Sequence, residues 1–218
     1  MTSAEQANRH EPRVDVEPET RKYVTDYFNQ PFIAEPSKPT SMDPETWVDQ
    51  HGDSLFRYAV MRVGNRSLAE DLVQEALLAA LQAQDRFDGR ASVRTWLIAI
   101  LRKKVIDYLR RAKRESGSGD TQFFDPAEHR KRRLRPWSDD PARLLEEKEF
   151  WQVFHRCADQ LPEKLSDVYY LREIAGLATD EICDLLDIEA ANLALRLYRA
   201  RAAMRHCLDR NWFQHEKK

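Results

Sequence analysis

Apolar positions recur at helical spacing in three stretches separated by turn-forming residues. The first stretch ends at Gly64-Asn65, and its apolar positions are Leu55, Phe56, Ala59, Val60 and Val63. The second begins near Ser67, which stands three residues before Glu70 as in a capping box. Asp88-Gly89 forms a turn before the third stretch, which runs from Ser92 to Arg114. This spacing predicts a domain of three packed helices over residues 43–114.

A second group of periodic apolar positions lies within residues 142–218. Inside this helical unit, a short helical pattern around Ile182 is followed by a tight turn at Asp187 and then by a longer pattern with Leu193, Leu197, Ala200 and Met204 inward. This arrangement is typical of a helix-turn-helix, whose second helix enters the DNA major groove. Asn192, Arg196 and Arg199 lie on or beside its outward face, where Asn suits adenine and Arg suits guanine or phosphate. A plain helical hairpin shows the same pattern, so the motif alone favours DNA binding only weakly.

Two segments lack this periodicity. Residues 1–42 carry prolines among acidic and small polar residues, and residues 115–141 combine Gly, Pro and a basic run. We expect residues 1–42 to be a disordered or regulatory N-terminal extension, whose cluster Tyr23, Tyr27, Phe28 and Phe32 is its one apolar patch. Residues 115–141 are expected to be a flexible linker. The pattern predicts an all-α protein with two small helical domains joined by this linker, the second a helix-turn-helix domain.

The net charge of -2 conceals a strong separation of charge along the chain. Residues 102–114 hold seven basic residues and one acid, beside the apolar Val105, Ile106 and Leu109. A basic stripe of this kind favours DNA phosphates, because binding releases condensed counterions. Cations near a helix C-terminus also complement the helix dipole, so this block leaves both interpretations open.

Other features narrow the class of protein. Cys157, Cys183 and Cys207 are odd in number and form no CxxC pair, which argues against a disulfide framework or a zinc knuckle and predicts separate buried or half-buried thiols in a reducing cytosol. The longest apolar run, Trp96 to Leu101, is far short of the roughly 20 residues that span a bilayer, and the N-terminus has no signal-peptide pattern. The histidines show no metal-ligand spacing and no Gly-rich phosphate loop is present. We therefore expect a cytoplasmic protein without membrane insertion, metal, cofactor or enzymatic activity.

An ordered set of motifs resembles one bacterial family. Residues 71–78, 86–89, 94–100 and 107–111 resemble the second conserved region of extracytoplasmic-function (ECF) sigma factors, and residues 161–164, 170–174, 181–182 and 197–201 resemble the fourth region of the same family. Each motif is weak alone, but their order, their spacing and the intervening linker agree. The resemblance implies a factor that binds core RNA polymerase and gives it promoter specificity.

The resemblance also implies roles for individual residues. Docking on the coiled coil of the polymerase β′ subunit falls to Asp71, Gln74 and Glu75, with Leu78 as their apolar neighbour. The basic third helix is expected to hold the −10 element, where a base is flipped from the non-template strand. Phosphate contacts there are assigned to Arg102, Lys103, Lys104, Arg110 and Arg111, whereas Trp96 is expected to pack in the core. Asn192, Arg196 and Arg199 would read the −35 element.

The same resemblance implies contact with the polymerase β subunit and an anti-sigma protein that covers both domains. The family often has Gly where this chain has Asp187, a residue type that visits the left-handed conformation more readily than most. One alternative is a stand-alone helix-turn-helix regulator that acts without core polymerase. Tight duplex binding in the absence of polymerase would favour that alternative.

Overall fold

The computed structural model describes residues 43–115, here the first unit, and residues 148–213, the second unit. The first unit contains the 3-10 turn η1 (Pro44–Thr46), the helices α2 (Trp47–Val63) and α3 (Arg66–Ala83), the turn η2 (Gln84–Arg86) and the helix α4 (Val93–Glu115). The second contains α7 (Lys148–Asp159), α8 (Glu163–Tyr169), the π-helical turn η3 (Tyr170–Ile174), α9 (Thr179–Leu186), α10 (Ala190–Leu208) and the π-helical turn η4 (Asp209–Phe213). No strand occurs within these two ranges, and the prediction of an all-α protein is confirmed. The predictions for residues 1–42 and for most of the linker lie outside the described residues.

The junction between α2 and α3 follows from two adjacent residues. Gly64 ends α2 in the left-handed conformation, at φ 68°, which glycine adopts without steric cost. Asn65 then caps α3, because its side-chain oxygen accepts a hydrogen bond from the Leu68 amide at 2.9 Å. The prediction that Ser67 caps this helix is wrong, since Asn65 provides a cap two residues earlier and Ser67 lies inside α3.

Three helices pack around the core of the first unit. Buried apolar residues line the facing sides of α2, α3 and α4, among them Leu55, Leu72, Ala76, Leu97 and Leu101. Trp96 is half-buried, with its ring 5.7 Å from that of Trp47 and 5.1 Å from that of Phe87 between centroids. The prediction that Trp96 packs in the core is thus confirmed.

The second unit has the predicted helix-turn-helix. Asp187 ends α9 with φ 51° and ψ 56°, the left-handed conformation expected for this position. Ala178 offers no capping side chain, but Glu181 accepts a hydrogen bond from the Ala178 amide at 2.8 Å and so satisfies one donor at the start of α9. Leu193, Leu197, Ala200 and Met204 are buried on one side of α10, as predicted.

Two of the cysteines form a disulfide. Cys157 on α7 and Cys207 on α10 are 50 residues apart in sequence, yet their Cα atoms lie 5.7 Å from each other, a separation that a disulfide spans. The prediction of three separate thiols is therefore wrong for this pair. Packing of α7 against α10 brings the two residues together, and no local sequence pattern encodes that contact. Cys183 is a free, half-buried thiol, as expected.

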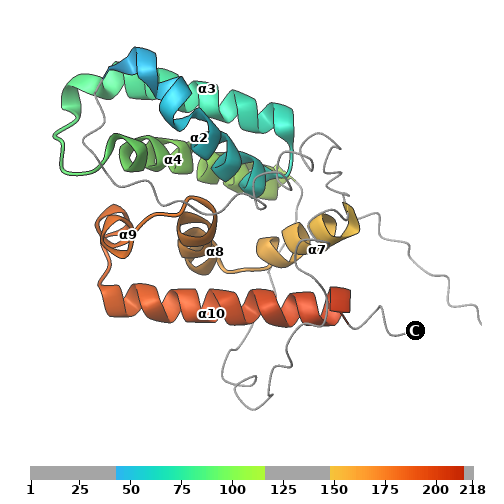
Figure 1. Cartoon of the computed structure of the whole chain (residues 1–218). Helices are drawn as coiled ribbons and strands as arrows, with labels where there is room; N and C mark the ends of the chain where they lie inside the picture. Colours follow the sequence, from blue (N-terminus) through green and yellow to red (C-terminus); the bar gives the residue numbers. More distant parts are fainter. Residues whose placement is uncertain (1–42, 116–147, 214–218) are drawn as a thin grey trace, which may run out of the picture.

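The two units pack against each other. Figure 1 shows α8 and α9 between the first unit and α10, so that α10 lies on the far side of the second unit. The contact is made mainly by α2 and α4 with α8 and η3. Within the described ranges, no helix is both long enough and apolar enough to cross a membrane. We call this packed state of the two units the closed arrangement.

Candidate polymerase-docking and nucleic-acid interfaces

The exposed side of α3 carries the residues assigned to polymerase docking. Asp71, Gln74 and Glu75 are exposed, and the side of the helix opposite them is fixed in the core by Leu72 and Ala76. Leu78 is 61% exposed, although leucines usually lie inside a folded domain. The structure therefore places all four residues on one accessible face, where carboxylates adjoin an apolar side chain.

Leu81 extends this face by one further turn. It is 46% exposed and follows Leu78 by three residues, so the two leucines adjoin on the helix surface. Sequence reasoning missed Leu81, although its position in the same periodic pattern is a usable signal. We call Asp71, Gln74, Glu75, Leu78 and Leu81 together the α3 ridge.

The five basic residues assigned to the −10 element do not share one free surface. Lys103 and Arg111 are exposed, but the other three are held by carboxylates. Lys104 pairs with Glu75 of the α3 ridge at 3.0 Å, and Arg110 pairs with Glu163 of the second unit at 2.6 Å. The fifth residue, Arg102, faces α8. In the closed arrangement only part of the basic stripe on α4 is available to a phosphate.

Arg102 forms the most enclosed of these ion pairs. Its Nε lies 3.0 and 2.9 Å from the two carboxylate oxygens of Asp167, and Nη2 also donates to this carboxylate. The Asp167 side chain is only 8% exposed. Partial burial lowers the pKa of Arg102, but the hydrogen bonds and charge of Asp167 raise that pKa above its usual value overall. Arg102 is therefore held as a cation by an internal carboxylate.

Other arginines of the first unit extend this contact. Arg57 is 3% exposed and donates through Nε to the Ile174 carbonyl at 2.9 Å. Arg62 is 8% exposed, donates to the Ser166 hydroxyl, and its guanidinium carbon lies 4.6 Å from the centre of the Tyr170 ring. A desolvated guanidinium above an aromatic ring is a favourable arrangement.

The first turn of α4 also reaches the second unit. Arg94 donates to the Ala175 carbonyl, and the Thr95 hydroxyl donates to Glu181, the residue that caps α9. Five arginines of the first unit thus meet carboxylates, a hydroxyl and carbonyl oxygens of the second: Arg57, Arg62, Arg94, Arg102 and Arg110. We call these contacts the arginine interface. Sequence patterns did not predict this interface. Arg62 offers a signal for it, because this arginine lies one helical turn from the buried Tyr58 and so on the same side of α2.

Burial also affects the tyrosine beneath this interface. Tyr58 is fully buried in α2, and burial raises its pKa to about 12, while the charge of nearby Arg62 acts in the opposite direction. Tyr58 therefore stays neutral at ordinary pH. Its ring packs next to the buried guanidinium of Arg62, and its hydroxyl does not change charge with pH in the ordinary range.

The outward face of α10 is accessible. Asn192 and Arg199 are exposed and Arg196 is half-buried, which agrees with the predicted orientation of the three residues. Leu195, missed by sequence reasoning, is 48% exposed and lies among them at helical spacing. None of these four residues lies in the arginine interface, and α10 is on the far side from the first unit (Figure 1). The closed arrangement leaves this face free.

The described residues contain no cluster of potential metal ligands. No group of three or more His, Cys, Asp or Glu side chains is arranged there to hold an ion. The surfaces described above are an acidic and apolar ridge on α3 and basic faces on α4 and α10.

Family models match both units. Residues 47–115 match sigma-70 region 2, and residues 151–204 match sigma-70 region 4. The chain is 34% identical over 171 residues to a probable RNA polymerase sigma factor of Haemophilus influenzae, which covers 75% of this chain and 88% of that relative. It is 31% identical over 134 residues to the ECF RNA polymerase sigma-E factor of Escherichia coli K12, covering 62% of this chain and 70% of that protein.

Solved structures share the fold. The sigma factor RpoE of Bartonella quintana, in complex with the anti-sigma factor NepR, matches with a TM-score of 0.56 at 21% identity, over 78% of this chain and 99% of that chain. CnrH, in complex with the cytosolic domain of CnrY, matches with a TM-score of 0.55 at 24% identity, over 77% and 88% of the two chains. The family models that match both units and the sequence relatives show that the chain belongs to the ECF group of RNA polymerase sigma factors.

Proposed function

We propose that this sigma factor divides its work among three helix surfaces. The α3 ridge docks on the coiled coil of the polymerase β′ subunit, the basic stripe of α4 holds the −10 element, and the outward face of α10 reads the −35 element. The family activity is binding of core RNA polymerase and promoter-specific initiation of transcription. We further propose that the protein has no enzymatic activity and acts in the cytoplasm, together with core polymerase and promoter DNA.

The exposure of the α3 ridge is the observation that carries this proposal. Helix docking needs an apolar contact surrounded by polar groups that fix orientation, and the ridge offers Leu78 and Leu81 beside Asp71 and Glu75. Adjacent exposed leucines lower the solubility of an isolated domain, and an exposed apolar patch of this kind marks a surface that a partner protein covers.

On α10, the same kind of argument supports base reading. Asn192 suits adenine, Arg196 suits guanine, and Leu195 offers an apolar contact to a thymine methyl group. Arg199 is a full turn away and suits a backbone phosphate. These four residues occupy the exposed side of a helix whose opposite side is fixed in the core.

The closed arrangement limits the first unit more than the second. Arg102 and Arg110 are paired with Asp167 and Glu163, so they contact phosphate only after the units separate. Polymerase binding at the α3 ridge requires no such separation, because the ridge lies outside the arginine interface. We therefore propose that docking precedes opening, and that the β subunit and the promoter hold the separated second unit.

An anti-sigma protein is a further proposed partner. Both structural neighbours were solved with a second protein bound, the anti-sigma factor NepR in one and the cytosolic domain of CnrY in the other. A protein that binds both units at once would stabilise the closed arrangement and keep Arg102 paired with Asp167.

Reconstituted transcription tests the proposal. The purified chain is added to core RNA polymerase with a genomic DNA library, and transcript starts are mapped. We expect starts that share −10 and −35 elements and that are absent with core polymerase alone. Failure to bind core polymerase, together with failure to initiate, would contradict the proposal, and tight duplex binding without polymerase would favour a stand-alone regulator.

A further inference from the structure

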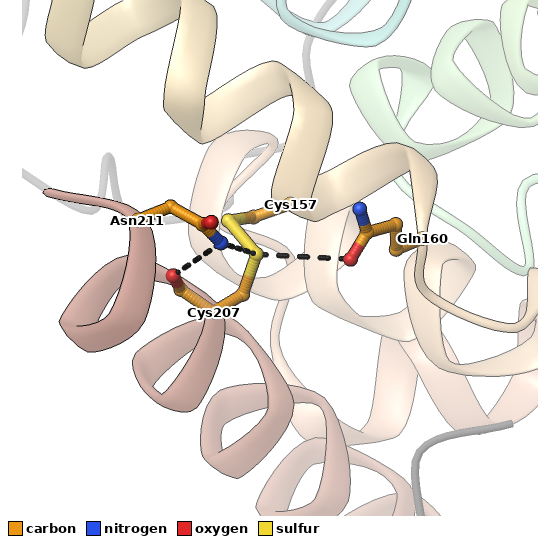
Figure 2. The surroundings of a disulfide bond; sticks show 4 residues. All are labelled: Cys157, Gln160, Cys207 and Asn211. Atoms are coloured by element: carbon orange, nitrogen blue, oxygen red, sulfur yellow. Dashed lines mark hydrogen bonds between the residues drawn. A yellow bond between two sulfur atoms is a disulfide. The ribbon is translucent and has the colours of Figure 1, made fainter. Parts of the chain in front are cut away.

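The disulfide between Cys157 and Cys207 lies at the wall of a pocket in the second unit. The pocket has a volume of about 300 Å³, and both cysteines, Gln160, His206, Arg210 and Asn211 line it. Figure 2 shows the side chains of Gln160 and Asn211 on either side of the Cys207 sulfur. A small molecule that enters this pocket reaches the disulfide directly.

The two sulfur atoms differ in accessibility. Cys157 is 2% exposed and belongs to the core of the second unit. Cys207 is half-buried and faces the pocket from α10. An oxidant or an attacking thiolate therefore meets the Cys207 sulfur first, while Cys157 stays within bonding distance on the inner side.

Polar groups of both kinds surround the Cys207 sulfur, with the acceptor Gln160 Oε1 3.8 Å away on one side and a hydrogen-bond donor on the other. The Asn211 amide nitrogen lies 3.3 Å from the Cys207 sulfur and donates to the Cys207 carbonyl at 2.9 Å (Figure 2). Arg210 adds a positive charge to the wall of the same pocket. Hydrogen-bond donors and cations near a thiol stabilise the thiolate, which is the nucleophile in thiol–disulfide exchange and in reaction with peroxides.

We propose that Cys157 and Cys207 are a redox-active pair, with Cys207 as the reacting cysteine and Cys157 as the resolving one. In the dithiol form, the Cys207 thiolate attacks a hydroperoxide, which gives a sulfenic acid at Cys207 and releases water or an alcohol after protonation. The Cys157 thiol then displaces water from that sulfenic acid and closes the disulfide. In all, two thiols and one hydroperoxide become one disulfide, one water and one further water or alcohol.

A small thiol reduces the disulfide back to the dithiol form. A small thiol enters the pocket as its thiolate, attacks the Cys207 sulfur and releases the Cys157 thiolate, which takes up a proton. A second molecule of that thiol then attacks the mixed disulfide, which frees Cys207 and yields the oxidised thiol as product. The cysteines are thus compatible with a reducing compartment, in which the dithiol form predominates until an oxidant appears.

The position of the bond connects this chemistry to DNA reading. The loop that it closes spans 50 residues and contains α8, α9 and nearly all of α10, which is the entire helix-turn-helix. Without the bond, packing alone holds α7 against α10 and against the turn η4, where the ring centroids of Phe150 and Trp212 are 5.7 Å apart. The dithiol form therefore remains folded but has a less stable second unit, because a long loop in its unfolded state is no longer constrained.

Thiol titration and trapping test the pair in the full-length protein. We expect three reactive thiols after treatment with dithiothreitol and unfolding, and one after brief exposure of the folded, reduced protein to one equivalent of hydrogen peroxide. Peptide mapping should then recover a Cys157–Cys207 crosslink. In Cys157→Ser, dimedone should trap a sulfenic acid at Cys207, whereas Cys207→Ser should consume peroxide at least about tenfold more slowly than the wild type.

Two variants separate a redox role from a purely structural one. Asn211→Leu removes the donor beside the sulfur and should slow the reaction of the reduced protein with peroxide roughly fivefold, while the fold by circular dichroism is kept. Cys183→Ser, the matched control, should leave peroxide consumption and the crosslink unchanged. Dithiothreitol should lower the Tm of the wild type by on the order of 10 °C and leave that of Cys207→Ser unchanged.

Several outcomes would overturn the proposal. One is a wild-type protein that reacts with peroxide no faster than Cys207→Ser. Another is a disulfide that dithiothreitol reduces only after the protein has been unfolded, which would make the bond a structural crosslink. A third is a crosslink that involves Cys183 in place of Cys157.

Discussion

Arg102 on α4 and Asp167 on α8 face each other across the contact between the two units, with the guanidinium Nε 3.0 and 2.9 Å from the two carboxylate oxygens. A carboxylate offers two oxygens in a plane, as a phosphate offers them at its edge, and the guanidinium suits both. In the closed arrangement, Arg102, which is proposed to contact the −10 backbone, is therefore occupied by the Asp167 carboxylate, which resembles a DNA phosphate in charge and geometry.

Asp167→Asn should weaken the closed arrangement. The substitution removes the negative charge but keeps the shape, so Arg102 loses most of its electrostatic partner in a poorly solvated contact. We expect a loss of about 1–3 kcal/mol in the free energy of unfolding and a larger radius of gyration by small-angle scattering. Affinity for single-stranded DNA should rise severalfold, because Arg102 becomes available.

The matched control for this substitution is Glu163→Gln. Glu163 pairs with Arg110 across the same contact, but its side chain is 54% exposed and that of Arg110 is 60% exposed, so solvent screens the pair. We expect a change in unfolding free energy of less than about 0.5 kcal/mol. If Asp167→Asn and Glu163→Gln changed the radius of gyration equally, the pair of Arg102 with Asp167 would hold the units together no more strongly than the exposed pair of Arg110 with Glu163.

Charge reversal on the α3 ridge should abolish binding to core polymerase. In the double variant Asp71→Arg/Glu75→Arg, two cations replace the carboxylates on an exposed helix face, so the fold should survive while the complementary partner is repelled. We expect at least a tenfold loss of affinity for core polymerase, measured by fluorescence anisotropy of a labelled sigma factor, with an unchanged circular dichroism spectrum.

Glu70→Arg provides the comparison on the same helix. Glu70 is exposed and pairs only locally with Arg66, one turn earlier, at 2.9 Å. This reversal changes the charge by two units, as each reversal in the double variant does, but outside the ridge, and we expect polymerase affinity to stay within about twofold of wild type. Retention of polymerase binding by the double variant would mean that another surface docks on the β′ subunit.

Alanine substitutions on α10 should distinguish base reading from phosphate contact. Asn192→Ala and Arg196→Ala should each cost about 1–3 kcal/mol at particular base pairs of the −35 element and relax specificity there. Arg199→Ala should instead weaken binding evenly across sequences and reduce the salt dependence by about one unit of slope. Binding of the second unit within the polymerase holoenzyme to a library of −35 sequences measures both effects.

Arg156→Ala is a suitable control for these three variants. Arg156 is exposed on α7, away from the α10 face, and it carries the same charge as Arg196 and Arg199. Its loss should leave −35 specificity unchanged. A uniform effect of all four substitutions would indicate general electrostatic attraction and would contradict base reading by Asn192 and Arg196.

Local sequence patterns predicted the parts of this fold that depend on neighbours in sequence. The helix-turn-helix followed from apolar spacing around Asp187, whose left-handed backbone was expected from the residue type. The outward direction of Asn192 and Arg199 followed from the same periodicity, since Leu193 and Leu197 fill the opposite side. The cap of α3 was misplaced by two residues, because Asn65 and Ser67 are both suitable capping types.

Contacts between distant segments could not be predicted in this way. Arg62 meets Ser166 and Cys157 meets Cys207 only because helices far apart in sequence pack together. Periodicity shows which side of a helix is buried but not which helix covers it. The basic stripe of α4 illustrates the limit, because sequence predicted one DNA-facing surface whereas Arg102 and Arg110 pair with acids of the second unit.

His155 should make the stability of the second unit depend on pH. It is 6% exposed beside the rings of Trp151 and Phe154, and burial lowers its pKa to about 4, against about 6.5 in an unfolded chain. Between these two values the unfolded state binds the proton and the folded state does not, so stability is lost as pH falls from about 6.5 to about 4.

The size of this effect and its source are measurable with one variant. Urea unfolding of the wild type should show a loss of about 2 kcal/mol between pH 7.5 and pH 5.0 that is attributable to His155. His155→Phe keeps an aromatic ring in the same apolar surroundings and removes the titrating nitrogen, so its stability should fall by about 2 kcal/mol less over that interval. Parallel pH profiles for the two proteins would contradict this account, since they would show that the unfolded chain gains nothing by protonating His155.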